Sequence, residues 1–397
     1  MAGNQRENER KARQRNKERK IQRIGWSIII LVTAILIVMK VVEVDFNSIK
    51  DKYVDENGKV SISDDIEMSA YPYQLDSSGG VKLSYQGNML NILTDSSCTV
   101  LDPKTANSLN SFSHGYANPI VRTAGNYFCT YDQGATRIRL DNLKKNEFED
   151  TVKKPILTAD VSSSGNVIYA TSSDESKSTV YVVSNTLKSL MKQDINSGYV
   201  VAVAIDATGK RCAYAAVNTK NAKLVTTVYT INVGDEGERA SFDYPGTNVL
   251  DLKYCGADLY FVGDNCVYTV TSQKKQREAF KQGSANTVCF GYTKDNELLY
   301  VYSDYSSANE NHLVNISSSG RVRKSIELKK RPKSVTSVSN EICVLFGDTI
   351  KIYSLTSGDE KASFKCDDGV SCAYKLSSRV YVVKGQMLDI IEQEDKK

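Results

Sequence analysis

Short runs of alternating apolar and polar residues cover most of the chain after residue 80. The clearest example is Asn166–Asn185, NVIYATSSDESKSTVYVVSN, in which two apolar, β-branched and aromatic runs flank a polar segment. Runs of this composition over four to seven residues are typical of β-strands, and the polar segment between them is typical of a turn. The pattern therefore predicts two strands joined by a turn.

The same pair of strands recurs seven more times along the chain. The first strands begin at or just after Gly87, Gly125, Gly165, Gly209, Gly256, Asp295, Ser339 and Ser377, and the second near Cys98, Thr136, Thr179, Val225, Cys266, His312, Thr349 and Met387. A short apolar strand precedes most pairs, as in VVAVAID from Val200, and a weaker one follows most, as in RASFDY from Arg239. Each unit thus predicts four strands in about forty residues.

Repeats of this length with four strands each indicate an all-β fold, a β-propeller of eight blades, or of seven if the first or last unit packs outside the ring. One four-stranded sheet cannot bury both of its faces, whereas a ring of sheets buries each against its neighbours. A β-sandwich is the alternative, but eight similar units exceed what one sandwich holds. The last unit, Val370–Gln393, has only three strands. We expect the segment Ile62–Leu75 to supply the fourth and close the ring.

Charge is distributed unevenly between the start of the chain and the repeats. Of the 51 basic and 47 acidic residues, ten basic and three acidic ones lie within residues 1–40. The remainder of the chain is therefore nearly neutral, which argues against a nucleic-acid partner for the propeller.

The first 61 residues predict a membrane anchor rather than a folded domain. Residues 1–23 form a basic tail, and Ile24–Val42 is an apolar segment of nineteen residues whose one charge is Lys40. That length just spans a hydrocarbon core of about 30 Å. The positive-inside rule then places the tail in the cytoplasm and the propeller outside, at the cell membrane. A cleaved signal peptide and a nucleic-acid-binding tail are the alternatives.

The anchor divides the chain into five parts. We expect a cytoplasmic tail at 1–23, a single transmembrane helix at 24–42, a polar stalk at 43–61, the propeller at 62–393 and a short tail at 394–397.

Residues suited to metal binding or catalysis are few. The nine cysteines include no CxxC pair, and the chain has only two histidines, so we expect neither a metal site nor a cofactor. Two cysteine pairs could approach disulfide distance, Cys255 with Cys266 and Cys366 with Cys372. Catalytic motifs such as GxSxG, HExxH and the P-loop are absent from the sequence, so we expect no catalytic residues.

Long loops are the remaining candidates for a binding site, because loops on a rigid scaffold often carry function. The longest expected loops begin at Ser172, Val217 and Ser303. The most ligand-like residues near them form one candidate ligand- or partner-binding group: Tyr116, Asp174, Glu175, Tyr305, Asn309 and His312.

The basic tail, anchor segment and degenerate repeats together resemble a family of uncharacterised single-pass membrane proteins of Gram-positive, clostridia-like bacteria, known only as a domain of unknown function. The blades also resemble those of WD40-like and quinoprotein-like propellers. No blade carries a Gly-His or Trp-Asp pair, and the sole tryptophan is Trp26 in the anchor segment. This departure argues against a quinone cofactor. The resemblance implies a propeller at the membrane, without an activity.

Two functions remain open at this point. The first is a non-enzymatic binding or scaffolding module for an envelope protein or a cell-wall polymer. The alternative is an extracytoplasmic polysaccharide hydrolase or lyase with its site at the mouth of the propeller channel. A third possibility, an effector role for the basic tail, is the weakest, because twenty-odd polar residues build no core.

Overall fold

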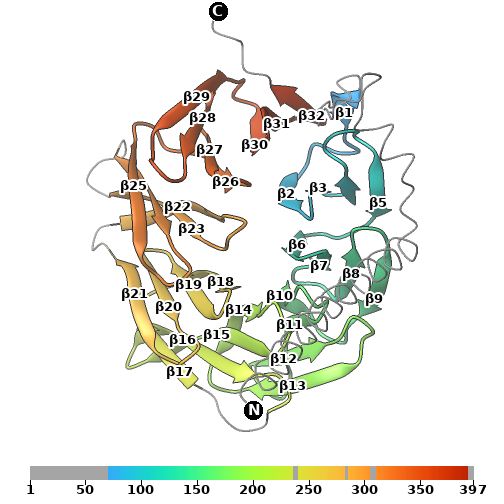
Figure 1. Cartoon of the computed structure of the whole chain (residues 1–397). Helices are drawn as coiled ribbons and strands as arrows, with labels where there is room; N and C mark the ends of the chain where they lie inside the picture. The colour runs from blue at the N-terminus through green and yellow to red at the C-terminus, as the bar shows by residue number, and fades with distance from the viewer. Residues whose placement is uncertain (1–69, 236–239, 282–284, 305–309, 392–397) are drawn as a thin grey trace, which may run out of the picture. The chain divides into compact units, whose positions relative to one another are not determined.

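The computed structural model describes residues 70–235, 240–281, 285–304 and 310–391. The expected cytoplasmic tail, anchor helix and stalk lie outside these residues. In the described part of the chain, we find no apolar helix of membrane-spanning length. The repeats belong to one compact unit that begins at Ile66, and they form eight antiparallel four-stranded sheets arranged as a ring (Figure 1).

The first four blades follow one another along the chain, each running from its innermost to its outermost strand. Their strands are β2 Lys82–Gln86, β3 Met89–Leu93, β4 Ser97–Leu101 and β5 Ser108–Ser113 in blade one; β6 Pro119–Ala124, β7 Tyr127–Asp132, β8 Arg137–Asn142 and β9 Asn146–Thr151 in blade two; β10 Ile156–Val161, β11 Val167–Ser172, β12 Ser178–Val183 and β13 Ser189–Ile195 in blade three; and β14 Tyr199–Ile205, β15 Arg211–Lys220, β16 Lys223–Asn232 and β17 Ala240–Pro245 in blade four.

The next four blades repeat this order, except that the last recruits a strand from the start of the unit. Their strands are β18 Val249–Cys255, β19 Asp258–Gly263, β20 Cys266–Val270 and β21 Gln276–Lys281 in blade five; β22 Ala285–Tyr292, β23 Leu298–Asp304, β24 Asn311–Ile316 and β25 Val322–Leu328 in blade six; β26 Ser334–Ser337, β27 Glu341–Leu345, β28 Thr349–Ser354 and β29 Glu360–Lys365 in blade seven; and β30 Val370–Leu376, β31 Arg379–Lys384, β32 Met387–Ile391 and β1 Tyr73–Gln74 in blade eight. The structure therefore has eight four-stranded blades, as the repeat predicted.

The two ends of the unit meet in blade eight. Strand β1 pairs with β32 through Tyr73 opposite Leu388 and Gln74 opposite Met387. On the blade-one side, the hydroxyls of Tyr71 and Tyr381 both donate to the Pro103 carbonyl, at 2.9 and 2.7 Å. The innermost strands β30 and β2 are also in contact. The earlier part of the expected closing segment, residues 62–69, lies outside the described residues.

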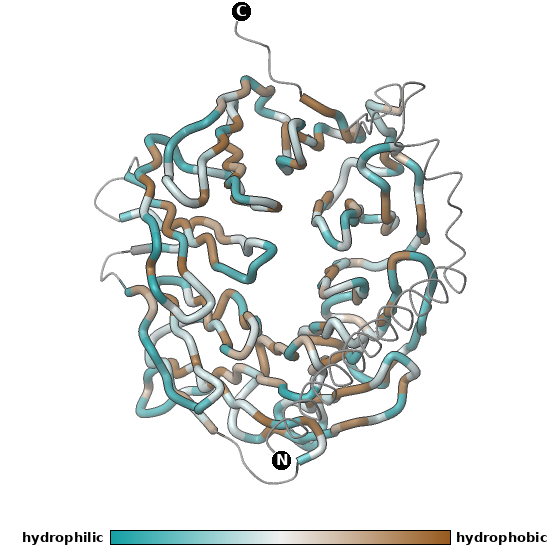
Figure 2. Tube along the Cα trace, in the orientation of Figure 1, coloured by the Kyte–Doolittle hydropathy of each residue, from teal (hydrophilic) through white to brown (hydrophobic). Residues whose placement is uncertain are grey.

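Each pair of neighbouring blades shares a hydrophobic core. Between blades three and four, for example, Ile168, Val180 and Val182 pack against Val203 and Tyr214. Figure 2 shows the contrast with the rim, where the outermost strands β21 and β25 carry mostly hydrophilic residues. Burial of apolar faces between sheets, about 25 cal/mol per Å² of apolar surface, is the force that holds the ring together.

The recurring tyrosines of the second strands are core residues, as their equivalent positions predict. Tyr169, Tyr260, Tyr300 and Tyr381 are each the third residue of their strand and are at most 8% exposed. Burial of a tyrosine requires a partner for its hydroxyl. Tyr260 donates to the Ile316 carbonyl at 3.0 Å, and the Tyr300 and Thr287 hydroxyls lie 2.7 Å apart.

One expected loop is a strand pair instead. The polar segment VNTKNAK from Val217 continues β15 and β16, and only Asn221 and Ala222 form the turn. Both residues adopt positive φ, 51° and 58°, as the tight two-residue turn of a hairpin requires. The sequence predicted a loop here because both faces of the projecting hairpin are in water. Its strands therefore lack the alternation of apolar and polar residues that predicts a β-strand.

Candidate functional site

The ring has two faces, which we define by the connections that they carry. The turn face carries the turns between the first and second strands of each blade, such as Gly125–Asn126 and Gly256–Ala257. The crossover face carries the connections between blades, such as residues 114–118 and 246–248. The channel along the axis is lined by the innermost strands and opens on both faces.

A cavity of about 430 Å³ occupies the turn-face end of the channel. Every blade contributes a residue of its innermost strand to the lining: Tyr85, Thr123, Asp160, Ile205, Tyr254, Tyr292, Ser337 and Tyr374. The turns supply the rim. At Gly125, in one of these turns, φ is +57° and a Cβ would lie 2.9 Å from the Ser163 Cβ, so that position requires glycine. The cavity volume falls within the usual range for small-molecule sites.

Four tyrosines dominate the wall of this cavity. Tyr85, Tyr254, Tyr292 and Tyr374 lie near the turn-face ends of β2, β18, β22 and β30, and all four are half-buried. The Tyr254 hydroxyl donates to the Cys212 carbonyl at 3.3 Å, and the Tyr85 hydroxyl donates to Asn88 Oδ1 at 3.3 Å. These bonds hold the rings in place while the cavity remains open.

An ion pair crosses the channel. Strands β6 and β18 lie across the opening from each other (Figure 1), and Arg122 Nη2 of β6 approaches Asp251 Oδ1 of β18 to 2.7 Å. The Tyr292 hydroxyl donates to Asp251 Oδ2 at 2.8 Å. The carboxylate is only 3% exposed, and its charge raises the pKa of the Arg122 guanidinium. Arg122 Nε is buried without an acceptor among the described residues.

Asp160 is the second carboxylate of the channel. Its Oδ2 accepts a hydrogen bond from the Ile205 backbone N–H at 3.1 Å. Burial raises the pKa of Asp160 to about 6, because the charged form loses solvation that Arg122 only partly replaces. This carboxyl group therefore keeps its proton to a higher pH than an exposed aspartate does.

Two lysines add positive charge to the cavity. Lys253 Nζ lies 4.1 Å from the centre of the Tyr292 ring, a cation–π contact. Lys294 lies in the exposed turn of blade six. Within the described residues, neither lysine forms an ion pair with a carboxylate. The charged side chains that line the cavity are therefore Lys253, Lys294 and Asp160.

The crossover-face end of the channel has a different character, because the innermost strands repeat one irregularity. In five blades, β-bulges leave one residue of the innermost strand unpaired near its beginning: Leu157, Val201, Leu250, Val288 and Ser371. A bulge places an extra residue outside the ladder and redirects its side chain.

Four of these bulged residues are apolar and belong to consecutive blades, three to six. We call Leu157, Val201, Leu250 and Val288 the apolar collar. Val201 is 44% exposed and Leu250 46%, and Tyr199 beside them is 61% exposed. Val288 packs partly on the core, whereas Leu157, Val201 and Leu250 belong to no hydrophobic cluster of the described residues. Exposed apolar groups that gather at one mouth mark an interaction surface.

The residues predicted from the loops lie on three separate parts of the ring. Tyr116 lies between blades one and two, Asp174 and Glu175 follow β11 in blade three, and His312 lies in β24 of blade six. Tyr305 and Asn309 lie outside the described residues. No hydrogen bond, ion pair or ring contact joins Tyr116, Asp174, Glu175 and His312 to one another in the described part of the chain.

Each of these side chains has local partners. Tyr116 is 6% exposed, stacks on His114 at 4.7 Å and lies beneath Arg137. Burial raises the pKa of Tyr116 to about 12. Asp174 pairs with Lys154, and His312 stacks on Tyr302 at 5.1 Å. Glu175 donates its backbone N–H to Ser173 Oγ. The binding role predicted for this group stays a prediction.

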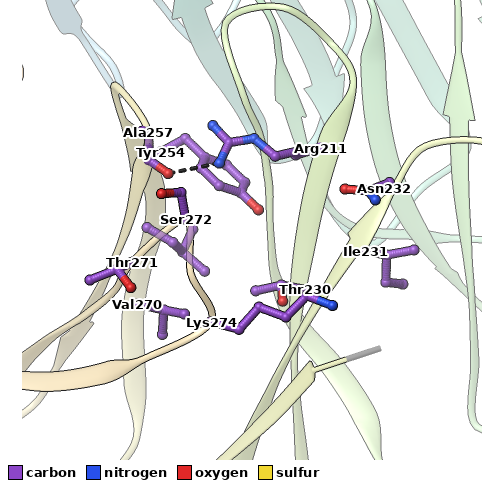
Figure 3. Close-up of a pocket in the computed structure, with 11 residues that line it drawn as sticks. Arg211, Thr230, Ile231, Asn232, Tyr254, Ala257, Val270, Thr271, Ser272 and Lys274 are labelled. Atoms are coloured by element: carbon purple, nitrogen blue, oxygen red, sulfur yellow. Dashed lines mark hydrogen bonds between the residues drawn. The ribbon is translucent and has the colours of Figure 1, made fainter. Parts of the chain in front are cut away.

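A second, smaller cavity of about 50 Å³ lies between blades four and five (Figure 3). Arg211 points across it and donates to the Ala257 carbonyl at 2.8 Å, as the dashed line in Figure 3 marks. Its Nε also donates to Asp206 at 3.1 Å, and its guanidinium lies 5.2 Å from the Tyr254 ring centre. With these partners, Arg211 links two blades and supports Tyr254 in the channel wall.

All nine cysteines are free thiols in this structure. Neither Cys255 with Cys266 nor Cys366 with Cys372 forms a bond. Burial raises the pKa of Cys98 and Cys255 to about 12, which makes these thiols poor nucleophiles. No group of three or more potential metal-ligating side chains occurs among the described residues.

Sequence reasoning missed the channel residues. The pattern predicts the short strands that precede each pair, as in VVAVAID and VLDLKYC, but it does not show that their side chains line one channel. The available signal was polar or aromatic residues near the ends of otherwise apolar innermost strands, such as Asp251 and Tyr254. Arg122 and Asp251 are 129 positions apart, and no local pattern links them.

Comparison with known proteins identifies a family for this chain and solved structures with a similar fold. The model of a family described as "Family of unknown function (DUF5711)" matches residues 56–392. No curated protein matches the sequence. Similar solved structures include the eukaryotic initiation factor, with 12% identity and a TM-score of 0.52 over 78% of this chain and 83% of that one. Apo AztD from Citrobacter koseri has 12% identity and a TM-score of 0.51 over 78% and 88% of the two chains.

Saccharomyces cerevisiae Sqt1 is also similar, with 10% identity and a TM-score of 0.53 over 81% of this chain and 98% of that one. At such low identity these likenesses concern the fold alone.

Proposed function

The chain belongs to the family of unknown function DUF5711, and we propose that it is a membrane-anchored, extracytoplasmic propeller that binds an envelope protein. In this proposal it is a binding or scaffolding module and catalyses no reaction. The apolar collar on the crossover face is the observation that carries the proposal. A propeller offers a broad rigid face to partners, and many different functions are built on it.

The collar favours a protein partner with an apolar segment. Tyr199 and Val201 lie on β14 and Leu250 on the neighbouring innermost strand β18, and all three side chains are exposed where solvent would otherwise favour polar residues. Lys177 Nζ lies 5.7 Å from the Tyr199 ring centre and would remain at the edge of such an interface. Apolar cores with aromatic residues and a polar rim are typical of protein–protein interfaces.

The anchor is the second part of the proposal. The nineteen apolar residues of Ile24–Val42 would cross the membrane once, with the basic residues 1–23 in the cytoplasm. Protease treatment of intact cells, with epitope tags at both ends, tests this topology. Loss of the C-terminal tag with protection of the N-terminal tag is expected, and protection of both tags would contradict it.

The collar is tested by site-specific photo-cross-linking from position 199 in intact cells, followed by mass spectrometry. We expect one dominant envelope protein in the product. The double variant V201D/L250D should then reduce binding of that purified protein to the full chain at least tenfold, since charges replace the apolar contacts. V322D is the matched control, because Val322 is 47% exposed on the outermost strand β25.

Equal loss of binding in V322D, or full binding by V201D/L250D, would contradict a role for the collar. Absence of any cross-linked protein would contradict the proposed partner class.

The alternative, polysaccharide hydrolysis, rests on the two channel carboxylates Asp160 and Asp251. An acid with a raised pKa beside an ionised carboxylate is the arrangement that glycosidases use. Asp251, however, is 3% exposed and bonded to both Arg122 and Tyr292, which leaves it no access to a substrate. Release of reducing ends from wall polysaccharide by the wild type, but not by D160N, would overturn the binding proposal.

A further inference from the structure

The cavity on the turn face lies at the other end of the channel from the collar. We propose that it binds an acidic sugar, that is, a pyranose ring that carries a carboxylate. This site goes beyond the partner binding proposed above, because it uses a different mouth and different residues.

The aromatic lining fits a sugar ring. The C–H groups on one side of a pyranose form an apolar surface, which packs favourably on the face of an aromatic ring. Tyr85, Tyr254 and Tyr374 come from three different blades and are partly exposed to the cavity. The hydroxyls of Tyr85 and Tyr254 are held by Asn88 and by the Cys212 carbonyl. Their ring planes are therefore set before a ligand arrives, which lowers the entropic cost of binding.

The charged residues of the lining fit a carboxylate on that ring. Lys253 Nζ lies over the Tyr292 ring, and no carboxylate of the described residues lies within 4 Å of it. Lys294 on the rim is likewise without an ion pair in the described part of the chain. A ligand carboxylate would satisfy a lysine and gain a charge-assisted hydrogen bond.

Asp160 distinguishes a sugar from a simple anion. Its carboxyl group lines the same cavity as Lys253, and it accepts hydrogen bonds from the backbone N–H groups of Ile205 and Val161. A bare anion would be repelled by Asp160 when that residue is ionised. A sugar acid instead has hydroxyl groups that donate to Asp160 while its carboxylate reaches Lys253. One ligand in the cavity could therefore contact the tyrosine rings, the Asp160 carboxylate and the lysine ammonium groups.

The test is isothermal titration of the full-length chain with D-galacturonate, D-galactose and inorganic phosphate. We expect galacturonate to bind at least tenfold more tightly than galactose or phosphate. K253Q should weaken galacturonate binding about tenfold. The matched control is K365Q, which removes the same charge from an exposed lysine of the outermost strand β29.

Equal affinity for galactose would overturn the role of the carboxylate, and equal affinity for phosphate would overturn the role of the sugar ring. No binding of galacturonate at millimolar concentration would overturn the proposal altogether. If K253Q fails to fold, K294Q in the exposed turn of blade six replaces it, with the same expectation.

A further titration, with an oligosaccharide, determines whether the ligand is a free sugar or the end of a wall polymer. Tetragalacturonate that binds at least as tightly as the monomer would support the proposal with a polymer end as the source. Binding of the monomer alone would support it with a free sugar. The variant V201D/L250D should bind galacturonate normally, so failure of one proposal leaves the other measurable.

Discussion

Asp160 shows how the channel changes the chemistry of a single residue. On an exposed turn its carboxyl group would ionise near 3.8, but in the channel its pKa is about 6 because burial removes part of its solvation. Arg122 opposes this effect only in part, since its guanidinium is committed to Asp251. The residue carries a proton under mildly acidic conditions, when most other carboxylates have lost theirs.

Replacement of Asp160 by asparagine should change the pH dependence of stability. Between about pH 4 and pH 6 the unfolded chain has lost this proton while the folded chain retains it, so the free energy of unfolding falls as the pH rises. A shift from 3.8 to about 6 corresponds to at most about 3 kcal/mol. The D160N variant should lack this dependence of the free energy of unfolding on pH. It should be more stable than the wild type above pH 6, because it has no buried charge at this position.

Urea unfolding at pH 4.5 and pH 7.5, followed by circular dichroism, measures the difference. D295N, at an exposed turn position, is the control and should keep the wild-type slope. An equal change in the free energy of unfolding between pH 4.5 and pH 7.5 in D160N and the wild type would contradict the raised pKa of Asp160.

At the level of elements, the closing contacts of blade eight matter most. Tyr71 precedes β1 and packs edge-on against Tyr381, with ring centres 5.7 Å apart. Both hydroxyls share the Pro103 carbonyl of blade one. These contacts bind the first described residues, the last blade and the first blade to each other.

Loss of Tyr71 should therefore weaken the whole ring. Tyr71→Phe removes one buried hydrogen bond and should cost about 1 kcal/mol of the free energy of unfolding. Tyr71→Ala also leaves a cavity and should cost about 3–5 kcal/mol. The control is Tyr199→Ala, at a tyrosine that is 61% exposed, with an expected change within about 0.5 kcal/mol. Chemical denaturation provides the three values, and equal effects of the two alanine variants would exclude a closing role for Tyr71.

At the level of the whole molecule, the Arg122–Asp251 pair joins blades two and five across the channel. Coupling of distant blades in this way stiffens the channel walls on which both proposed sites depend.

Replacement of Arg122 alone should lower the free energy of unfolding more than replacement of both Arg122 and Asp251. R122L leaves the Asp251 carboxylate buried without its cation and should cost about 3–5 kcal/mol. The double variant R122L/D251L removes that uncompensated charge and should recover much of the loss, apart from about 1 kcal/mol for the Tyr292 hydroxyl. The exposed pair Lys220–Asp243 is the comparison, because water screens both charges and breaking the pair should leave the free energy of unfolding almost unchanged. Additive losses in the double-mutant cycle would show that the pair is not coupled.

Local sequence patterns were sufficient for the architecture. Alternating apolar and polar residues, turn residues and a period of about forty residues predicted eight four-stranded blades, because these features depend on neighbours along one strand. The same reasoning identified Tyr260 and Tyr300 as core residues. It failed at Val217–Lys223, where a hairpin that projects into water has no apolar face to reveal it. The anchor helix at 24–42 stays a prediction.

The candidate site depended on tertiary structure. Loop composition directed attention to Tyr116, Asp174 and His312, which the ring keeps apart. Asp160, Lys253 and Tyr374 line one cavity because eight innermost strands converge on one axis, a relation that no local pattern encodes. The collar also required pairing, since a bulge at Val201 or Leu250 exists only relative to the neighbouring strand. Strand identity is a local property of the chain, whereas register and convergence follow from contacts between residues that lie far apart in it.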